Sequence, residues 1–208
     1  MAFYIDMKRY LETIEAYEQY PVETGKVLLY GSSFFRNWGF DRAREQWAAN
    51  SGLEVVNHGF GGATVDELLY YYDRLVRPYQ PSAVVLRPGH NDLTRGLTPE
   101  QAWFQTERLI AWLRTDWPEI PIVILQVFDT KRFANAERRA LNAEYNRRMQ
   151  AFAAETEGVS TVDLDPFFHD ETGEFRDIFV EDGLHLTNSG YEEMAAWLTP
   201  QVKALLQA

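Results

Sequence analysis

The stretch VLLYGSSFFRNW, residues 27–38, decides the fold. Its first four residues, 27–30, are apolar on both faces, which is typical of a strand buried on both sides in the centre of a parallel sheet. Gly31, Ser32 and Ser33 follow at the carboxyl end of that strand, the edge of an open α/β sheet where ligands bind. A serine at this edge can act as a nucleophile, but a serine before a helix is also a common N-terminal cap. The stretch alone leaves both interpretations open.

Apolar runs and helix signals alternate along the rest of the chain. Further strands are expected at residues 53–56, 83–86, 122–127 and 159–164. Helices are expected near residues 7–17, 41–49, 64–76, 98–117 and 136–157 and from residue 188 onward, with residues 165–182 irregular. Strands that alternate with helices pair in parallel through right-handed crossovers. The pattern therefore predicts an α/β fold, a flavodoxin-like three-layer αβα sandwich with a central five-stranded parallel sheet, and a single domain over residues 1–208.

Composition narrows the classes of function. The chain has 208 residues, 46% of them hydrophobic and 14% aromatic, which suits a packed core without disulfides. It contains no cysteine, so thiolate nucleophiles and Cys-ligated metal sites are excluded. The net charge of −11 repels phosphate backbones and anionic lipids, so we expect neither nucleic acid binding nor stable membrane association. Composition leaves the oligomeric state open.

The N-terminal stretch MAFYIDMKRYLE, residues 1–12, carries charges throughout and has no apolar core of the kind that signal peptides contain. No stretch of the sequence approaches the 18 apolar residues of a membrane span. A cytoplasmic location is the expectation that follows.

Every candidate functional residue falls on a loop that follows the carboxyl end of a predicted strand. The candidates are Ser32 and Ser33 after the first strand, Gly59, Gly61 and Gly62 after the second, residues 89–92 (GHND) after the third, and residues 182–185 (DGLH) after the fifth. Singly, each has an ordinary explanation: a capping serine, turn glycines, a turn asparagine or a surface histidine. Together they supply a nucleophile, a base, an acid and hydrogen-bond donors on one rim.

These blocks, in this order, resemble those of the SGNH hydrolases, also called the GDSL esterase/lipase superfamily. Residues 31–33 match the block Gly-Asp-Ser, Gly62 matches the second block, residues 89–92 match Gly-x-Asn-Asp, and residues 182–185 match Asp-x-x-His. Ser32 stands where the family usually has Asp. That Asp is not the triad acid, so the departure bears on the geometry of the loop rather than on the chemistry.

The resemblance covers nearly the whole chain and implies the SGNH hydrolase fold and the cleavage of carboxylic esters of small molecules through an acyl-enzyme. It implies Ser33 as the nucleophile, His185 as the general base and Asp182 as the acid that orients the base. It also implies an oxyanion hole made by the Ser33 and Gly62 backbone N–H groups and the Asn91 side chain. Neither a cofactor nor a metal is expected.

Residue chemistry supports the same roles. A serine hydroxyl needs a base to take its proton, and imidazole, with an unperturbed pKa of about 6.5, does this near neutral pH. Asp182 precedes His185 by three residues, so one turn of chain can bring the carboxylate to Nδ1 and leave Nε2 facing Ser33. Gly62 lacks a Cβ, so its backbone can approach a substrate closely.

Three other enzyme or cofactor sites fit less well. The nucleophile elbow of α/β-hydrolases would need glycine at the position of Phe35. A dinucleotide-binding loop over residues 59–64 would need a third glycine where Thr64 stands. Metal ligation by four acidic and histidine side chains is conceivable, but no pair has a familiar ligand spacing. These four are His58, His90, Asp92 and Asp182.

The substrate is less clearly indicated. Aromatic residues near the predicted rim could wall an acyl or sugar pocket, although most could equally be core: Phe34, Phe35, Trp38, Phe60 and Phe128. Because no long insertion could form a lid, short acyl groups, acetyl above all, on a small or carbohydrate alcohol are expected. The alternatives are a lysophospholipase or thioesterase with longer acyl chains and, in a different class, a non-catalytic domain that binds a small ligand.

Overall fold

The strands form one parallel sheet in this computed structural model, which describes residues 6–207. The strands are β1 (Val27–Gly31), β2 (Val55–Gly59), β3 (Ala83–Arg87), β4 (Ile122–Leu125) and β5 (Val159–Val162). Their order across the sheet is β2-β1-β3-β4-β5, and all neighbouring pairs are parallel. This is the flavodoxin-like order, and it confirms the predicted five-stranded parallel sheet.

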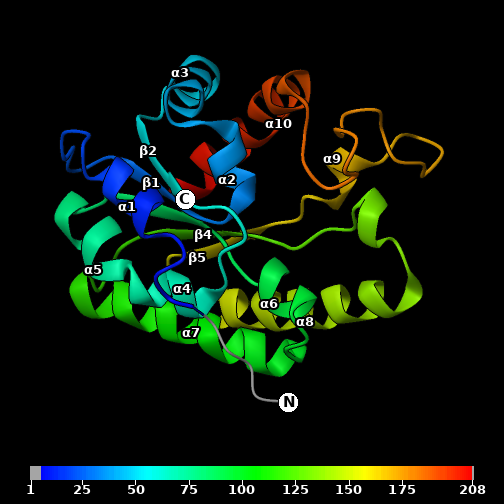
Figure 1. The fold of residues 1–208 in the computed structure, drawn as a ribbon, viewed down its shortest axis with the longest axis horizontal. Coiled ribbons are helices and arrows are strands. Elements are labelled where there is room, and N and C mark those ends of the chain that lie inside the picture. The colour runs from blue at the N-terminus through cyan, green and yellow to red at the C-terminus, as the bar shows by residue number, and fades with distance from the viewer. Residues whose placement is uncertain (1–5, 208) are drawn as a thin grey trace.

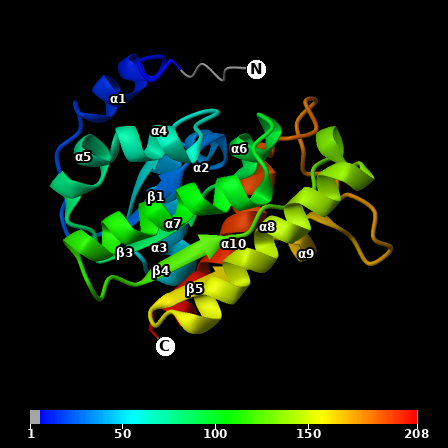
Figure 2. The same cartoon turned by 90° about the horizontal axis from the view of Figure 1, so that it is seen from below.

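Helices cover both faces of that sheet, which confirms the predicted three layers (Figure 1). The helices are α1 (Leu11–Tyr17), α2 (Ser33–Trp38), α3 (Phe40–Ser51), α4 (Val65–Tyr70), α5 (Tyr72–Leu75), η1 (Arg77–Tyr79), α6 (His90–Thr94), α7 (Pro99–Asp116), η2 (Lys131–Phe133), α8 (Ala136–Glu155), α9 (Asp165–Phe168) and α10 (Asn188–Leu206). One face is covered by α1, α4, α5, α7 and α8, and the other by α2, α3, α9 and α10. Seen from below, α7 and α8 lie side by side (Figure 2).

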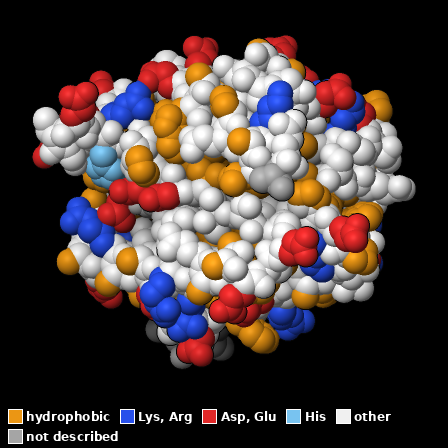
Figure 3. Space-filling view, turned by 180° about the vertical axis from the view of Figure 1, so that it is seen from behind, with side chains coloured by type: hydrophobic (Ala, Val, Ile, Leu, Met, Phe, Trp, Pro, Cys, Tyr) orange, Lys and Arg blue, Asp and Glu red, His pale blue; other side chains and the backbone are white. Residues whose placement is uncertain are grey.

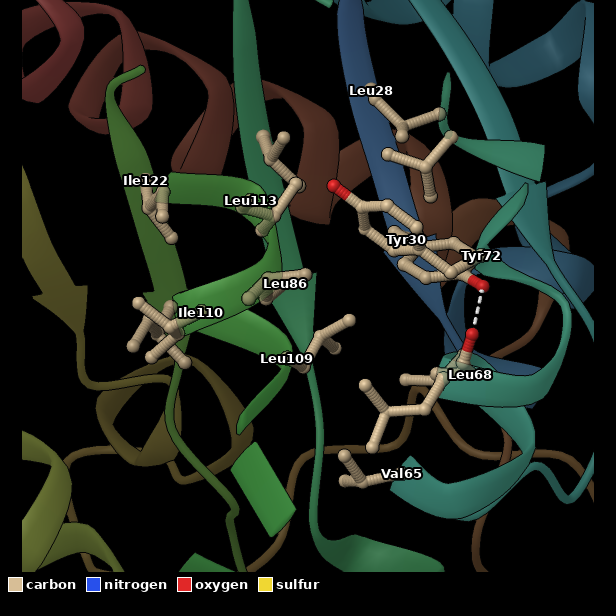
Figure 4. Packing of buried hydrophobic residues seen from close by; sticks show 14 of the residues in the cluster. Leu28, Tyr30, Val65, Leu68, Tyr72, Leu86, Leu109, Ile110, Leu113 and Ile122 are labelled. Carbon is tan, nitrogen blue, oxygen red and sulfur yellow. Dashed lines mark hydrogen bonds between the residues drawn. The ribbon is translucent and has the colours of Figure 1, made fainter. Parts of the chain in front are cut away.

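The central strand β1 supplies both hydrophobic cores. Leu28 and Tyr30 point into one core and Val27 and Leu29 into the other, as alternate residues of a strand must. The Tyr30 hydroxyl is fully buried and donates a 2.6 Å hydrogen bond to the carbonyl of Leu68 on α4 (Figure 4). The apolar run that predicted a strand buried on both sides is therefore confirmed.

The second strand begins and ends later than its prediction of residues 53–56. β2 continues through Asn57 and His58, which are polar but almost completely buried. The Asn57 amide donates a 2.8 Å hydrogen bond to the carbonyl of Phe35, and His58 Nδ1 lies 2.7 Å from the carbonyl of Leu75. The strand predicted from the apolar pattern ended too early, because hydrogen bonds to distant residues allow polar side chains to be buried in β2.

Other predicted boundaries also shift. The helix predicted over residues 64–76 is divided at Tyr71 into α4 and α5, and the stretch after β3 contains the short helix α6. Residues 165–182 are irregular except for α9. Glu67 accepts a 2.9 Å hydrogen bond from the Thr64 backbone N–H, as expected of the predicted capping pair. The absence of a signal peptide was predicted partly from residues 1–5, which lie outside the described residues.

Charged side chains of both signs are interspersed on the face seen in Figure 3. Acidic residues outnumber basic ones by 31 to 20 over the whole chain. Within residues 6–207, none of the helices combines the length and the apolar character that a membrane crossing requires.

Candidate active site

The serine pair lies where β1 meets α2. β1 ends at Gly31 and α2 begins at Ser33, so only Ser32 separates the strand from the helix. The Ser32 carbonyl accepts hydrogen bonds from the backbone N–H groups of Phe35 and Arg36, both at 3.1 Å. Ser33 is the first residue of the helix, and its backbone N–H therefore has no acceptor within the helix. Both its hydroxyl and its N–H are available at the carboxyl edge of the sheet.

A continuous hydrogen-bonded chain joins Ser33, His185 and Asp182. The Nε2 atom of His185 lies 2.9 Å from the Ser33 hydroxyl oxygen, and Nδ1 lies 2.6 Å from Oδ2 of Asp182. The His185 and Asp182 side chains are 25% and 33% exposed, so the dyad is open to a substrate from solvent. The arrangement has the geometry of a nucleophile, a base and an acid that orients the base.

Asp182 is held by its own loop. Its Oδ1 atom accepts hydrogen bonds from the backbone N–H groups of Leu184 at 2.8 Å and His185 at 2.9 Å. Partial burial acts to raise the pKa of Asp182, but these hydrogen bonds and the His185 ring outweigh burial and hold the pKa below its ordinary value. Asp182 is therefore ionised at neutral pH and accepts a hydrogen bond from the N–H at Nδ1 of His185.

The two other predicted oxyanion groups lie on neighbouring loops. Gly62 follows β2 and has a φ of +75°, a conformation that glycine adopts without strain. Asn91, near the start of α6, donates a 2.9 Å hydrogen bond to the carbonyl of Ala63, the residue after Gly62. One amide hydrogen of Asn91 ties the two loops together and the second is left for another acceptor.

Arginines far along the sequence hold the Gly62 loop, and the sequence patterns did not single them out. The Gly62 carbonyl accepts hydrogen bonds from Arg9 at 3.1 Å and Arg95 at 3.2 Å. Arg9 also forms a 2.6 Å ion pair with Glu67, whose side chain is fully buried. No local motif marks these contacts, because an arginine before α1 reaches its partners only after the chain has folded.

A pocket opens beside Ser33 and His185. Its empty volume is about 360 Å³, which includes space open to solvent. Phe34 and Phe128, two of the five aromatic residues predicted near the rim, line this pocket. The other three are completely buried in the cores, namely Phe35, Trp38 and Phe60.

The remaining histidine and acidic candidates do not gather into a second site. Burial lowers the pKa of His58 to about 4, and its ring packs at 4.3 Å from the ring of Tyr79. Burial raises the pKa of Asp92 to about 7, although its carboxylate accepts a 3.0 Å hydrogen bond from the Val65 N–H. His90 lines the pocket. Within the part of the chain that the structure describes, no cluster of three or more His, Asp or Glu side chains is arranged to hold a metal ion.

Comparison with protein families decides the family. The model of the GDSL-like lipase/acylhydrolase family matches residues 29–193, which include Ser33, Gly62, Asn91, Asp182 and His185. The chain belongs to this family. The resemblance seen in the sequence blocks is thereby confirmed, and membership supports acylhydrolase, esterase or lipase activity.

Individual relatives agree with this assignment. Thioesterase 1/protease 1/lysophospholipase L1 of Escherichia coli (strain K12) is 28% identical over 170 residues, which make up 78% of this chain and 72% of that protein. The structure of a provisionally assigned platelet activating factor from Streptococcus pneumonia superposes with a TM-score of 0.78 at 20% identity, over 96% of this chain and 94% of the other. A provisionally assigned acylhydrolase from Bacteroides fragilis NCTC 9343 superposes with a TM-score of 0.73 at 17% identity, over 99% and 100% of the two chains. At these identities the two structures support the fold.

Proposed function

We propose that this protein is a serine ester hydrolase that cleaves carboxylic esters through an acyl-enzyme. Ser33 is the nucleophile, His185 the general base and Asp182 the acid that orients it. The observation that carries the proposal is the hydrogen-bonded chain from the Ser33 hydroxyl through both ring nitrogens of His185 to Asp182. Because this chain lies at the carboxyl edge of the sheet, where ligands bind in open α/β folds, a substrate can reach it.

In the first half of the reaction, His185 Nε2 takes the Ser33 proton while the serine oxygen attacks the ester carbonyl. The carbonyl oxygen becomes negative, and the N–H groups of Ser33 and Gly62 and the free amide hydrogen of Asn91 donate to it. Loss of one such donor typically costs about 10²- to 10³-fold in rate. The C–O bond to the alcohol then breaks, the imidazolium returns its proton to the departing alcohol oxygen, and the acyl group stays on Ser33.

The second half repeats these steps with water. His185 removes a proton from a water molecule whose oxygen attacks the acyl carbonyl, and the imidazolium then returns that proton to the Ser33 oxygen as the acid leaves. Asp182 stays ionised throughout, because its hydrogen bonds keep its pKa low. Its charge favours the imidazolium that forms in both halves.

A short acyl group, acetyl above all, on a small or carbohydrate alcohol is the proposed substrate. The narrowness of the pocket supports this, since Phe34 and Phe128 line it and the space inside that a water-sized group can occupy is only about 20 Å³. The second candidate is a lysophospholipase or thioesterase with longer acyl chains. It is favoured by the similarity to the Escherichia coli protein that carries those names.

A chain-length series tests both candidates. Hydrolysis of p-nitrophenyl esters from acetyl to palmitoyl is measured with the wild-type protein and with Ser33→Ala. The proposal expects the highest kcat/KM at acetyl or butyryl, loss of turnover in Ser33→Ala and no change after prolonged chelation, because the base and the oxyanion donors are all protein groups. A maximum at the long chains would support the second candidate. Absence of turnover on the whole series would favour a non-catalytic binding domain.

A further inference from the structure

Arg87 is the last residue of β3, and it lies next to β1, the strand that leads to Ser33. The parallel register pairs Arg87 with Gly31, two residues before Ser33. Its side chain lines the pocket that Ser33 and His185 open into, yet it is only 4% exposed. A cation that is removed from water is costly unless an anion or hydrogen-bond acceptors compensate for it.

The protein itself supplies little of that compensation. Among residues 6–207, the buried Nε and Nη1 atoms of Arg87 have no hydrogen-bond partner. The guanidinium carbon lies 4.9 Å from the ring centre of Phe128 and 5.7 Å from that of Phe34, so two aromatic faces contact the cation. Aromatic faces attract a cation but do not accept its N–H groups as a carboxylate does. Burial lowers the pKa of Arg87 to about 10, which still leaves it charged at neutral pH.

His90 adds a second donor to the same pocket. Nη2 of Arg138 donates a 3.0 Å hydrogen bond to the His90 carbonyl and lies 3.3 Å from His90 Nδ1. Arginine cannot accept a hydrogen bond, so Nδ1 is the acceptor and the proton of the neutral ring is on Nε2. That Nε2 atom is buried and without a partner among the described residues. Burial and the charge of Arg87 lower the pKa of His90 well below its ordinary value, so the ring is neutral.

The two tyrosine hydroxyls near these donors form their hydrogen bonds with other groups. The Tyr191 hydroxyl donates a 2.8 Å hydrogen bond to the carbonyl of Phe34, and the Tyr145 hydroxyl lies 2.7 Å from Thr106 Oγ1. The groups whose charges shift the pKa of Arg87 are Tyr145, Arg138 and Tyr191, none of which is a carboxylate. In the wall of the pocket, Arg87 and His90 therefore combine buried N–H groups that lack an acceptor among the described residues with a positive charge that lacks an anion.

We propose that the ester substrate carries a carboxylate, which binds to Arg87 and to the His90 Nε2–H while Ser33 attacks the ester carbonyl. A planar carboxylate can accept two parallel hydrogen bonds from a guanidinium, and the aromatic rings of Phe34 and Phe128 keep that pair dry. The proposal deepens the esterase function and rests on it. The carboxylate can belong to the acyl chain or to the alcohol, and the experiment separates these two cases.

Two matched pairs of esters distinguish the cases. For the acyl side, the p-nitrophenyl monoester of glutaric acid is compared with p-nitrophenyl hexanoate. For the alcohol side, 4-acetoxybenzoate is compared with its methyl ester. Each kcat/KM is divided by the rate of alkaline hydrolysis of the same ester. In one pair the wild-type protein should favour the carboxylate by about ten- to a hundredfold, the usual effect of a hydrogen bond to a charged group.

Arg87→Met keeps the length of the side chain and removes the charge, so it should abolish this preference. Arg147→Met is the matched control, because Arg147 is 64% exposed on α8 and pairs with Glu144; it should keep the wild-type ratio. Circular dichroism checks that both variants fold. If Arg87→Met does not fold, the wild-type ratios still test the proposal, because a ratio near one in both pairs overturns it. A preference that survives in a folded Arg87→Met also overturns it.

A binding measurement separates failure of this inference from failure of the esterase function. Calorimetry with Ser33→Ala, which keeps the pocket but lacks the nucleophile, measures the affinity for the glutaric acid monoester, 4-acetoxybenzoate and their neutral partners. Tighter binding of a carboxylate without wild-type turnover of any ester would support the carboxylate site at Arg87 and contradict the esterase function. Turnover of the neutral esters, with equal binding of the two members of each pair, would support the esterase function and contradict the carboxylate site.

Discussion

Ser33 and His185 are 152 residues apart in the sequence, yet the His185 Nε2 atom lies 2.9 Å from the serine oxygen. Ser33 reaches this position because α2 begins there, directly beyond the end of β1. The neighbouring Ser32 has a different role, since its carbonyl accepts the first hydrogen bonds of α2 and the residue is buried. Which of the two adjacent serines is reactive therefore depends on which hydroxyl lies within hydrogen-bond distance of the His185 imidazole.

Exchange of each serine for alanine tests this assignment. Ser33→Ala should lose esterase activity and covalent labelling by a fluorophosphonate, because the attacking oxygen is gone. Ser32→Ala should keep most of both, because the backbone carbonyl that supports α2 remains. Mass spectrometry of the labelled wild-type protein locates the modified residue, and a label on Ser32 would contradict the assignment.

Replacement of Asp182 with Asn should lower kcat by about 10³- to 10⁴-fold with folding intact, because the orienting charge is lost and the wrong tautomer of His185 can be selected. The hydrogen bonds that lower the pKa of Asp182 keep it charged at neutral pH, so the loss in Asp182→Asn should be present there. Steady-state rates at neutral pH measure this effect. An active Asp182→Asn beside an inactive Asp92→Asn would make Asp92 the orienting acid, with His90 or His58 as the base.

At the scale of elements, the close approach of β2 and α2 fixes the start of the catalytic helix. A Cβ on Gly59 would lie 2.5 Å from the Arg36 backbone nitrogen and 2.8 Å from the Ser32 carbonyl oxygen. Backbone atoms at the start of α2 leave no space for a methyl group, so this glycine sets the distance between the strand and the helix that carries Ser33.

Gly59→Ala should therefore destabilise the fold by about 1–3 kcal/mol and lower activity, since α2 must move to relieve the overlap. Gly61→Ala is the matched control. Its Cβ would meet only the side chain of Arg36, at 2.7 Å from Nη1, and the end of a flexible side chain can move away. Urea unfolding followed by circular dichroism measures both variants. Equal stability of Gly59→Ala and Gly61→Ala would show that β2 and α2 can move apart at little cost in free energy.

At the scale of the whole molecule, burial by distant segments shifts the pKa values of two groups in opposite directions. His58 on β2 is 1% exposed, and burial lowers its pKa to about 4. Asp92 on α6 is also 1% exposed, and burial raises its pKa to about 7. Between pH 4 and 6.5 the folded protein keeps His58 neutral and Asp92 protonated, whereas the unfolded chain would charge both. Their effects on the pH dependence of stability therefore oppose each other.

Removal of either group should expose the effect of the other. Asp92 makes the free energy of unfolding fall as pH rises from about 4 to 7, because the folded state holds a proton that the unfolded state releases. Asp92→Asn should thus increase the slope of stability against pH by up to about 1.4 kcal/mol per pH unit over that range. Denaturation by urea at several pH values gives the slope.

His58→Gln is the counterpart, and its slope should decrease by a similar amount between pH 4 and 6.5. There the unfolded state binds a proton at His58 that the folded state excludes, so the contribution of His58 to stability falls with decreasing pH. Identical slopes in the wild-type protein and both variants would contradict the opposing burial of these two groups.

The sequence by itself determined the layers, the strand positions and the edge where the functional blocks gather. Periods of two and 3.6 residues are local properties, and parallel strands joined by helices place all their carboxyl ends on one rim. That rule, with the four sequence blocks, brought Ser33, Asp182 and His185 into one prediction before any distance was known. The structure joins them by hydrogen bonds, while their catalytic roles stay a prediction.

Only the tertiary structure decided how far β2 extends, which aromatic residues line the pocket and what surrounds Arg87. In the sequence, Arg87 is a charged residue at the end of an apolar strand, where solvent would be the ordinary surrounding. Its burial between Phe34 and Phe128 depends on residues from three separate strand ends. The cost of a buried charge depends on every atom within a few ångströms, and no local pattern of the sequence contains that information.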